Sequence, residues 1–300
     1  MTVLMIASGY NKNPDVIERL IKLGADVKSR DKGGWTALKC AALVNENPDV
    51  IERLIKMGAD VKERNKSGWT ALMMAAMSNK NPDVIERLIK LGADVKVRGE
   101  SGDTALMIAA TFNKNPDVIE RLIKLGADVK ARDEDGKTAL MEAVAFNENP
   151  DVIERLIKLG ADVKERNKDD DTALMIAADF IENPDVIELL IRRGADVKAR
   201  DKGGWTALIR AARFNKNPDV IERLINLGAD VNERYEFGMT TLMYAAKKNE
   251  NPDVIERLIK LGADVKARNK GGWTALDYAK NNKYIKGTKA FWILNDAMYK

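Results

Sequence analysis

The chain repeats itself every 34 residues. Its eight prolines all fall in the motif Asn-Pro-Asp-Val-Ile-Glu, which begins at Asn13, Asn47, Asn81, Asn115, Asn149, Asn183, Asn217 and Asn251. A fixed period of this length is typical of a solenoid, in which each unit buries its apolar face only against its neighbours. The 300 residues are therefore expected to form one continuous stack rather than two unrelated domains.

The repeat around Thr206 predicts two helices and a turn. Thr206 is expected to cap a short first helix with a face of small residues. Asn217 is a predicted N-cap, and Pro218 follows at the first helical position, where its missing N–H costs nothing. Gly228 supplies the left-handed residue that ends the second helix, and the segment up to Gly238 predicts an extended, projecting hairpin.

These residues resemble the ankyrin repeat family. Every full copy has a turn, a Thr-x-Leu helix start, Ala-Ala, a second helix and Gly-Ala-Asp-Val. The resemblance implies an all-α solenoid of helix-turn-helix units with projecting hairpin turns. It also implies that the turn tips and the exposed side of the first helices line a concave surface that binds another protein.

The sequence departs from the family pattern in three places. Thr70-Ala71-Leu72-Met73 stands for the usual Thr-Pro-Leu-His, so the Thr-to-His hydrogen bonding of the family is missing. The period exceeds the commonest one by a single residue, which comparison of the copies places in the Asn-x-Asn-Pro link. Asp170 replaces the turn glycine seen as Gly136 and Gly204, which puts the geometry of that turn in question.

The domain limits follow from the repeat. We expect a single domain over residues 1–300, with a partial repeat at 1–28, seven regular repeats at 29–266 and a capping repeat at 267–300. The first unit starts directly at a first helix, so the chain is interpreted as a possible fragment of a longer protein.

Composition argues against most catalytic and metal sites. The chain has no histidine and one cysteine, which removes the commonest general base, imidazole triads and thiolate zinc sites. Lys39 would lower the pKa of the adjacent Cys40 thiol, but without a base we interpret Cys40 as a small residue at a variable position. We expect no enzyme activity, cofactor or metal.

Charge and hydropathy restrict the partners and the compartment. The net charge of only +4 gives no case for nucleic acid, and no apolar run approaches the length of a membrane helix. We expect a monomer that is cytoplasmic, or delivered into a host cell by a route not visible in the sequence.

Comparison of the copies shows where they differ. The second helix barely changes, and its Glu52 and Lys56 predict an exposed i, i+4 ion pair. Two positions of the first helix and its turn carry unrelated side chains, and these are the predicted partner contacts. The position before the capping threonine supplies Trp35, Trp69, Asp103, Asp171 and Trp205, and the position five residues on supplies Glu142, Arg210 and Tyr244.

Aromatic and charged residues extend this predicted surface. Phe112, Phe146, Phe180 and Phe214 share one repeat position near the end of the first helix. Their rings either pack on the adjacent helix pair or form an aromatic strip for a partner, and the tryptophans beside the turns leave the same two alternatives.

The variable positions also segregate by charge. Acidic residues, Asp179 among them, dominate repeats three to five, whereas Arg210 and Arg213 belong to a basic segment in repeats six and seven. If functional, this pattern favours a protein partner with a basic segment facing repeats three to five.

The sequence therefore predicts a non-catalytic protein–protein interaction module that binds on its concave face. Two alternatives remain at this point. The chain could be the recruitment arm of a larger enzyme or effector, or it could be an engineered or consensus-derived scaffold, because its second helices are nearly identical.

Overall fold

The computed structural model describes residues 1–147 and 149–299, and its helices follow one another in pairs. The first helix of each pair is α1 (Val3–Tyr10), α3 (Ala37–Val44), α5 (Ala71–Ser78), α7 (Ala105–Phe112), α9 (Ala139–Phe146), α11 (Ala173–Phe180), α13 (Ala207–Phe214), α15 (Thr241–Lys248) and α17 (Ala275–Ala279). The second is α2 (Pro14–Lys22), α4 (Pro48–Lys56), α6 (Pro82–Lys90), α8 (Pro116–Lys124), α10 (Pro150–Lys158), α12 (Pro184–Arg192), α14 (Pro218–Asn226), α16 (Pro252–Lys260) and α18 (Lys289–Tyr299). A short 3-10 turn, η1 (Glu236–Gly238), precedes α15.

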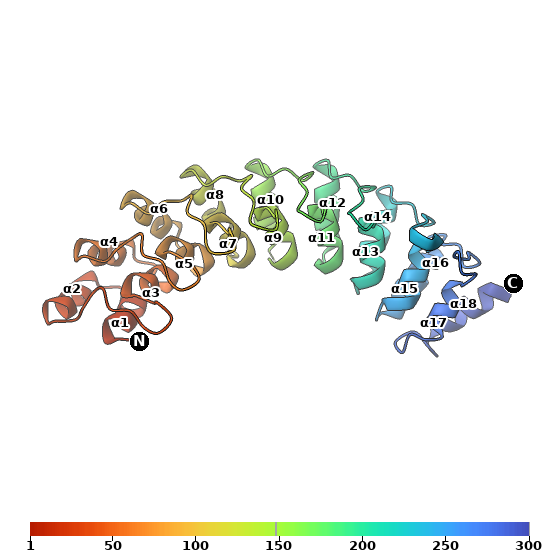
Figure 1. Cartoon of the computed structure of the whole chain (residues 1–300), viewed down its shortest axis with the longest axis horizontal. Coiled ribbons are helices and arrows are strands. Elements are labelled where there is room, and N and C mark those ends of the chain that lie inside the picture. Colours follow the sequence, from red (N-terminus) through yellow and green to blue (C-terminus); the bar gives the residue numbers. More distant parts are fainter. Residues whose placement is uncertain (148, 300) are drawn as a thin grey trace. The chain divides into compact units, whose positions relative to one another are not determined.

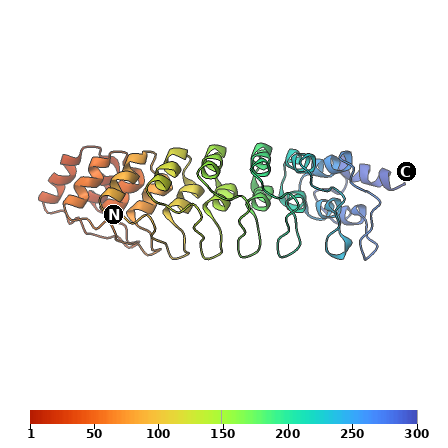
Figure 2. The ribbon, with the colours of Figure 1, turned by 90° about the horizontal axis from the view of Figure 1, so that it is seen from above.

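The chain divides into two compact units. The N-terminal unit runs from Met1 to Asp162 and holds α1 to α10, and the C-terminal unit begins at Val163 and holds α11 to α18. Within each unit the odd-numbered helices pack side by side in a first layer, and the even-numbered helices do so in a second layer (Figure 1). The loops that join consecutive pairs extend to one side of these layers (Figure 2).

The predicted helix signals act as expected in most repeats. Thr70 Oγ1 accepts a hydrogen bond from the Met73 amide at 3.4 Å, and Asn217 Oδ1 accepts one from the Asp219 amide at 2.9 Å. Pro218 is the first residue of α14, and Gly228 follows its C-cap with a φ of 107°. Thr206 is the N-cap residue of α13 as predicted, but its hydroxyl is hydrogen-bonded to Tyr235 Oη at 2.9 Å and makes no capping hydrogen bond.

Asp170 keeps the turn that the other repeats build with glycine. Its φ is 63°, in the left-handed region where Gly136 has 79°. The Asp170 amide donates to the Asn167 carbonyl at 3.1 Å, and the Gly136 amide donates to Asp133 at the same distance. The substitution therefore leaves the turn geometry unchanged and places an L-residue in a conformation that costs about 1–2 kcal/mol.

A ladder of buried asparagines occupies the link between the two helices of a pair. Asn113 Nδ2 donates to the carbonyls of Ala76 and Asn79, both at 3.0 Å, and its Oδ1 accepts the Asn115 amide. The same pattern recurs at Asn45, Asn79 and Asn147 in the N-terminal unit and at Asn215, Asn249 and Asn282 in the C-terminal unit. The link in which sequence comparison places the added residue therefore ties the repeats that carry this asparagine to the preceding repeat.

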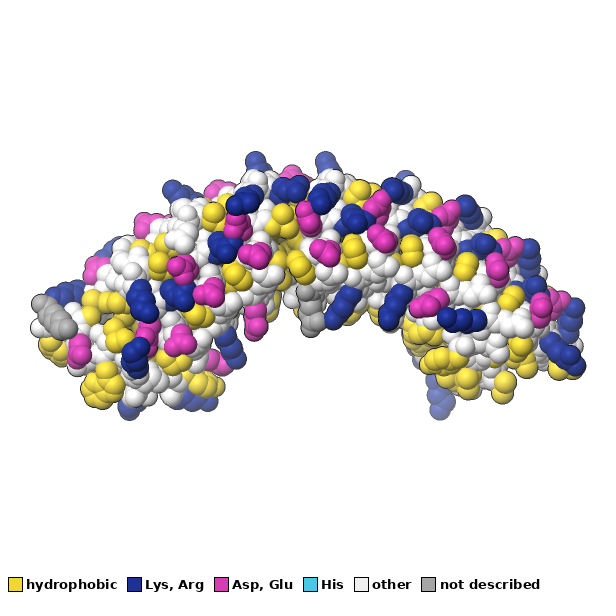
Figure 3. All heavy atoms as spheres, turned by 180° about the vertical axis from the view of Figure 1, so that it is seen from behind, with side chains coloured by type: hydrophobic (Ala, Val, Ile, Leu, Met, Phe, Trp, Pro, Cys, Tyr) yellow, Lys and Arg dark blue, Asp and Glu magenta, His cyan; other side chains and the backbone are white. Residues whose placement is uncertain are grey.

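Ion pairs join neighbouring helices of the second layer. The predicted pair of Glu52 with Lys56 is confirmed, and Glu52 also pairs with Arg87 of the next second helix, whose Nη1 lies 3.2 Å from Asp49 Oδ1. Equivalent arginines are Arg53, Arg121 and Arg155 in the N-terminal unit and Arg223 and Arg257 in the C-terminal unit. Basic and acidic side chains accordingly alternate over the second layer of each unit (Figure 3).

Candidate functional site

The four phenylalanines at the ends of the first helices are exposed. The exposed fractions are 56% for Phe112, 60% for Phe146, 62% for Phe180 and 49% for Phe214. Each is the last residue of its helix, and about half or more of its surface is open to solvent. These rings are therefore not buried in the core, and their contact with a partner stays a prediction. Large exposed rings at matching positions are typical of contact surfaces.

The tryptophans beside the turns are less exposed. Trp35, Trp69 and Trp205 are half-buried, and Trp273 is exposed. Part of each half-buried ring system packs against protein and the rest is open to solvent, so contact of the tryptophans with a partner stays a prediction.

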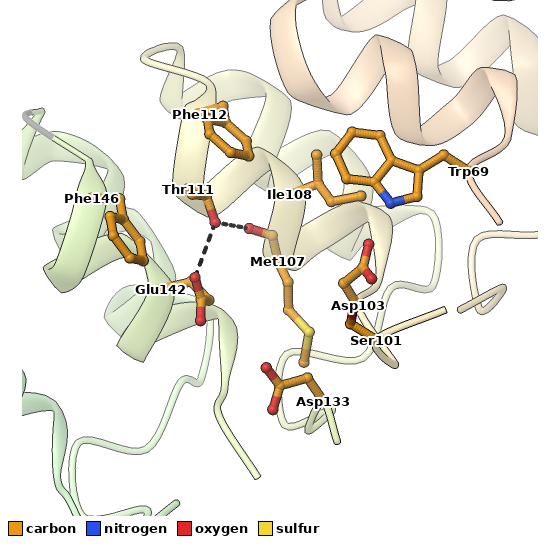
Figure 4. Close-up of a pocket in the computed structure, with 10 residues that line it drawn as sticks. All are labelled: Trp69, Ser101, Asp103, Met107, Ile108, Thr111, Phe112, Asp133, Glu142 and Phe146. Carbon is orange, nitrogen blue, oxygen red and sulfur yellow. Dashed lines mark hydrogen bonds between the residues drawn. The ribbon is translucent and has the colours of Figure 1, made fainter. Parts of the chain in front are cut away.

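A pocket of about 360 Å³ opens on the first layer of the N-terminal unit (Figure 4). Five of the six contact residues predicted in this unit line it, together with residues of α7 and of the turns on either side. The lining residues are Trp69, Ser101, Asp103, Met107, Ile108, Thr111, Phe112, Asp133, Glu142 and Phe146. The sixth, Trp35, lines a separate pocket of about 240 Å³ with Tyr10, Cys40 and Val44.

Carboxylates give the larger pocket its charge. Asp103 Oδ2 is buried and has no hydrogen-bond partner among the described residues. Glu142 lies between Lys137, whose Nζ is 3.7 Å from Oε1, and Thr111, whose hydroxyl donates to Oε2 at 3.5 Å. Burial raises the pKa of Glu142 above its usual range, and the Lys137 charge opposes that rise.

A buried ionic cluster lies on the first layer of the C-terminal unit. The Arg210 guanidinium donates to Asp179 Oδ2 at 2.8 Å, to Asp201 Oδ2 at 2.7 Å and also to Asp171. The sequence interpretation assigned Arg210 to a basic segment and the aspartates at 171 and 179 to an acidic one. That segregation is wrong at these residues, because the structure brings the opposite charges together inside one unit.

Burial dominates the electrostatics of this cluster. It raises the pKa of Asp179 from 3.8 to about 6, although the Arg210 charge opposes the change. Burial raises the pKa of Asp171 as well, against the same guanidinium. Asp179 Oδ1 has no hydrogen-bond partner in the described part of the chain. One arginine therefore does not fully compensate three partly desolvated carboxylates.

Arg213 is held by aromatic rings beside this cluster. Its guanidinium carbon lies 4.6 Å from the centre of the Trp205 ring and 4.7 Å from that of Phe214. Tyr244 completes the group, with its ring centre 5.7 Å from that of Trp205. Trp205, Arg213, Phe214 and Tyr244, all predicted contact residues, thus form one aromatic and cationic patch.

Sequence reasoning missed several residues that build these sites. Asp201, Tyr235 and Thr111 were not singled out, because each acts on a side chain that lies farther away along the chain. A repeat comparison could have flagged Tyr235, since the same position is Asp or Asn in six other copies.

The region around Cys40 also differs from expectation. Lys39 is buried in α3, where its Nζ lies 3.0 Å from Glu63 Oε1 and 3.1 Å from the Gly34 carbonyl oxygen. The predicted lowering of the Cys40 pKa is wrong, because burial and the nearby Asp31 charge raise it more than Lys39 lowers it.

Comparison with known protein families identifies the family to which this repeat architecture belongs. A model of ankyrin repeats in three copies matches residues 4–99, 74–167, 141–235 and 208–291, so the chain belongs to the ankyrin repeat family. Members of this family generally mediate protein–protein interaction and are typically non-catalytic. No curated protein matches the chain. None of the helices in residues 1–147 and 149–299 has the length and apolar character that crossing a bilayer requires.

Proposed function

We propose that this protein binds another protein through its first-layer face and catalyses no reaction. The first-layer face comprises the exposed sides of the odd-numbered helices and the turns that precede them. The exposed rings of Phe112 and Phe146, at the edge of a pocket that also takes in Trp69, carry this proposal. Burying such rings against a partner would supply apolar contact area at a low cost in side-chain entropy.

The second layer is the less suitable surface for a partner. Its arginines and glutamates already pair with one another from repeat to repeat, as Arg121 does with Glu86 and Asp83. A partner docking there would have to displace or desolvate these pairs, which costs more than surface ion pairs return. The variable residues lie on the first-layer face, which suits a surface selected for one particular partner.

Alanine at Phe112 and Phe146 tests the proposal. The double variant, a Leu23→Ala control and the native protein serve as baits for affinity capture from the source cell, followed by titration of the captured protein in purified form. Leu23 is a matched control because it is 76% exposed and lies at the end of α2, away from the first layer.

We expect the double phenylalanine variant to weaken binding by at least about tenfold, as truncation of a hot-spot pair does. The Leu23 variant should bind like the native protein. Equal binding by all three proteins would show that the partner uses another surface. Equal thermal melts of the three would exclude unfolding as the cause of a loss.

A further inference from the structure

The pocket beside α7 combines aromatic walls with carboxylates. Trp69, Phe112 and Phe146 present rings around its upper part, whereas Asp103 and Asp133 lie on opposite sides of the Met107 side chain (Figure 4). Its volume of about 360 Å³ falls at the lower end of the range for ligand pockets, about 300–1,000 Å³. A cavity of this size takes a single long side chain of a partner better than a folded segment.

The carboxylates that line the pocket favour a cationic ligand. Asp103 Oδ2 is buried without a hydrogen-bond donor among the described residues, a state that costs free energy until a donor arrives. Asp133 is fixed by its own turn, since its Oδ1 accepts the amides of Asp135 at 2.9 Å and Lys137 at 2.7 Å. Three carboxyl groups line the pocket, and the nearby ammonium of Lys137 reaches only Glu142 among them.

We propose that this pocket receives an arginine side chain of the protein partner. The proposal rests on the protein-binding function and names the chemistry that its first-layer face recognises. The arginine stem would lie against Ile108 and Met107, and its planar guanidinium would stack on an aromatic wall. Its N–H groups would donate to the Asp103 carboxylate, which lies against Gly99 in the unbound protein and would turn toward the pocket to accept them. An apolar side chain would leave the Asp103 carboxylate unpaired, and an acidic one would be repelled.

Arginine fits better than lysine for a geometric reason. Guanidinium is flat and weakly hydrated, so it can contact a ring with its face while its edge donates to a carboxylate. An ammonium group is compact and strongly hydrated, and it would have to lose more water to enter a pocket whose walls are mostly apolar.

The proposal can be tested with small probes that need no identified partner. N-acetyl-arginine methylamide is titrated into full-length protein carrying a ¹³C label on its methionine methyl groups, with the Met107 signal assigned from Met107→Leu. The lysine and citrulline analogues serve as comparison probes, since citrulline has the shape of arginine without its charge. Asp103→Asn removes the proposed acceptor charge, and Glu100→Gln is the matched control, because Glu100 is exposed in the same turn and does not line the pocket.

We expect arginine to shift the Met107 signal, lysine to bind at least about threefold more weakly, and citrulline to leave the signal in place. Asp103→Asn should weaken arginine binding at least about fivefold and Glu100→Gln less than twofold. Equal affinity for lysine would overturn the assignment to arginine. Equal shifts with citrulline, or native affinity in Asp103→Asn, would show that the pocket does not select a cation.

Failure of this assignment is distinguishable from failure of the proposed function. If no probe binds while alanine at Phe112 and Phe146 still abolishes partner binding, the first-layer face remains the binding surface and the arginine pocket is wrong. If the probes bind as expected while that double variant keeps native affinity for the partner, the pocket stands and the proposed function is wrong.

Discussion

Arg210 Nη1 donates to Asp179 Oδ2 at 2.8 Å and so ties α13 to α11, although the two residues lie 31 positions apart. The same guanidinium also binds Asp171 and Asp201. Reversing the charges at 171 and 179 would therefore remove internal partners of Arg210 as well as alter the surface. A test of binding by such reversals would mix folding with recognition, which is why the phenylalanines and Asp103 are better test positions.

Asp179→Asn should stabilise the protein at pH 7. Burial raises the pKa of Asp179 in the folded state to about 6 from its ordinary value of 3.8. Between these values the folded state binds more protons than the unfolded state, so stability falls as pH rises through that window. The shift corresponds to about 3 kcal/mol at 1.36 kcal/mol per pKa unit, as an upper bound on the gain from asparagine.

Melting temperatures of the native protein and Asp179→Asn, measured from about pH 4 to pH 7, check this expectation. The variant should lose most of its advantage near pH 4, where the native carboxyl group is protonated in the folded state and partly protonated in the unfolded state. Asp185→Asn is the control, since its side chain is 78% exposed and pairs with Arg223 at the surface. A variant that is less stable than the native protein at pH 7 would contradict the prediction.

Asn113→Ala should loosen the stack locally. The substitution leaves the buried carbonyls of Ala76 and Asn79 without the amide that binds both. An unsatisfied buried polar group costs about 1–3 kcal/mol. Hydrogen exchange of α7 and α8 should accelerate, while helices at the far end of the N-terminal unit keep native rates. Unchanged exchange would show that water or rearrangement replaces the bond. Asn115→Ala, which removes the half-buried N-cap of α8, is the comparison, and it should speed exchange in α8 while α7 keeps a rate close to the native one.

Backbone amides of α2, the helix at the start of the second layer, should exchange hydrogen faster than those of the interior second-layer helices. Helices α2 and α8 have the same nine residues, so their intrinsic exchange rates match and any difference reports packing. Val16 is exposed in α2, whereas Val118 is fully buried in α8. Amides of residues 16–23 should therefore be less protected than those of residues 118–125. Equal protection would refute the idea that each repeat depends on both neighbours.

Cys40 should react slowly with thiol reagents at neutral pH. Burial raises its pKa first, and the Asp31 charge adds to the increase. Asp31→Asn should speed the reaction with a disulfide reagent at pH 8, because it removes that charge and keeps the turn. Asn65 shows that asparagine can accept the same two amide hydrogen bonds at this position. Asp133→Asn, the same change in a distant turn, should leave the rate unchanged. A faster rate in both variants would point to general loosening.

The start and end of the helices could be predicted well from local sequence signals. Asn217, Pro218 and Gly228 act within a few residues of one another, so their spacing alone predicts where α14 begins and ends. The site was harder to predict. Arg210 contacts Asp171, which lies 39 residues earlier in the chain. The Thr206 hydroxyl is hydrogen-bonded to Tyr235 rather than to an amide of its own helix. Neither contact follows from the position of these residues in the repeat. Exposure of Phe112 could not be decided either, because a ring at the end of a helix can turn inward or outward with the same sequence.

The uniform second layer has a consequence for how the chain assembles. Helices α4, α6, α8 and α10 share the nine residues Pro-Asp-Val-Ile-Glu-Arg-Leu-Ile-Lys, and each offers the same ion-pair partners to the next. During folding, a helix that docks one unit out of order would meet the same atoms as in the native arrangement. Penalties for such misassembly must come from unlike residues of the first layer and its preceding loops, such as Lys39 of α3 with Glu63 of the loop before α5. The side chains proposed to recognise a partner belong to the same variable layer that enforces native chain order.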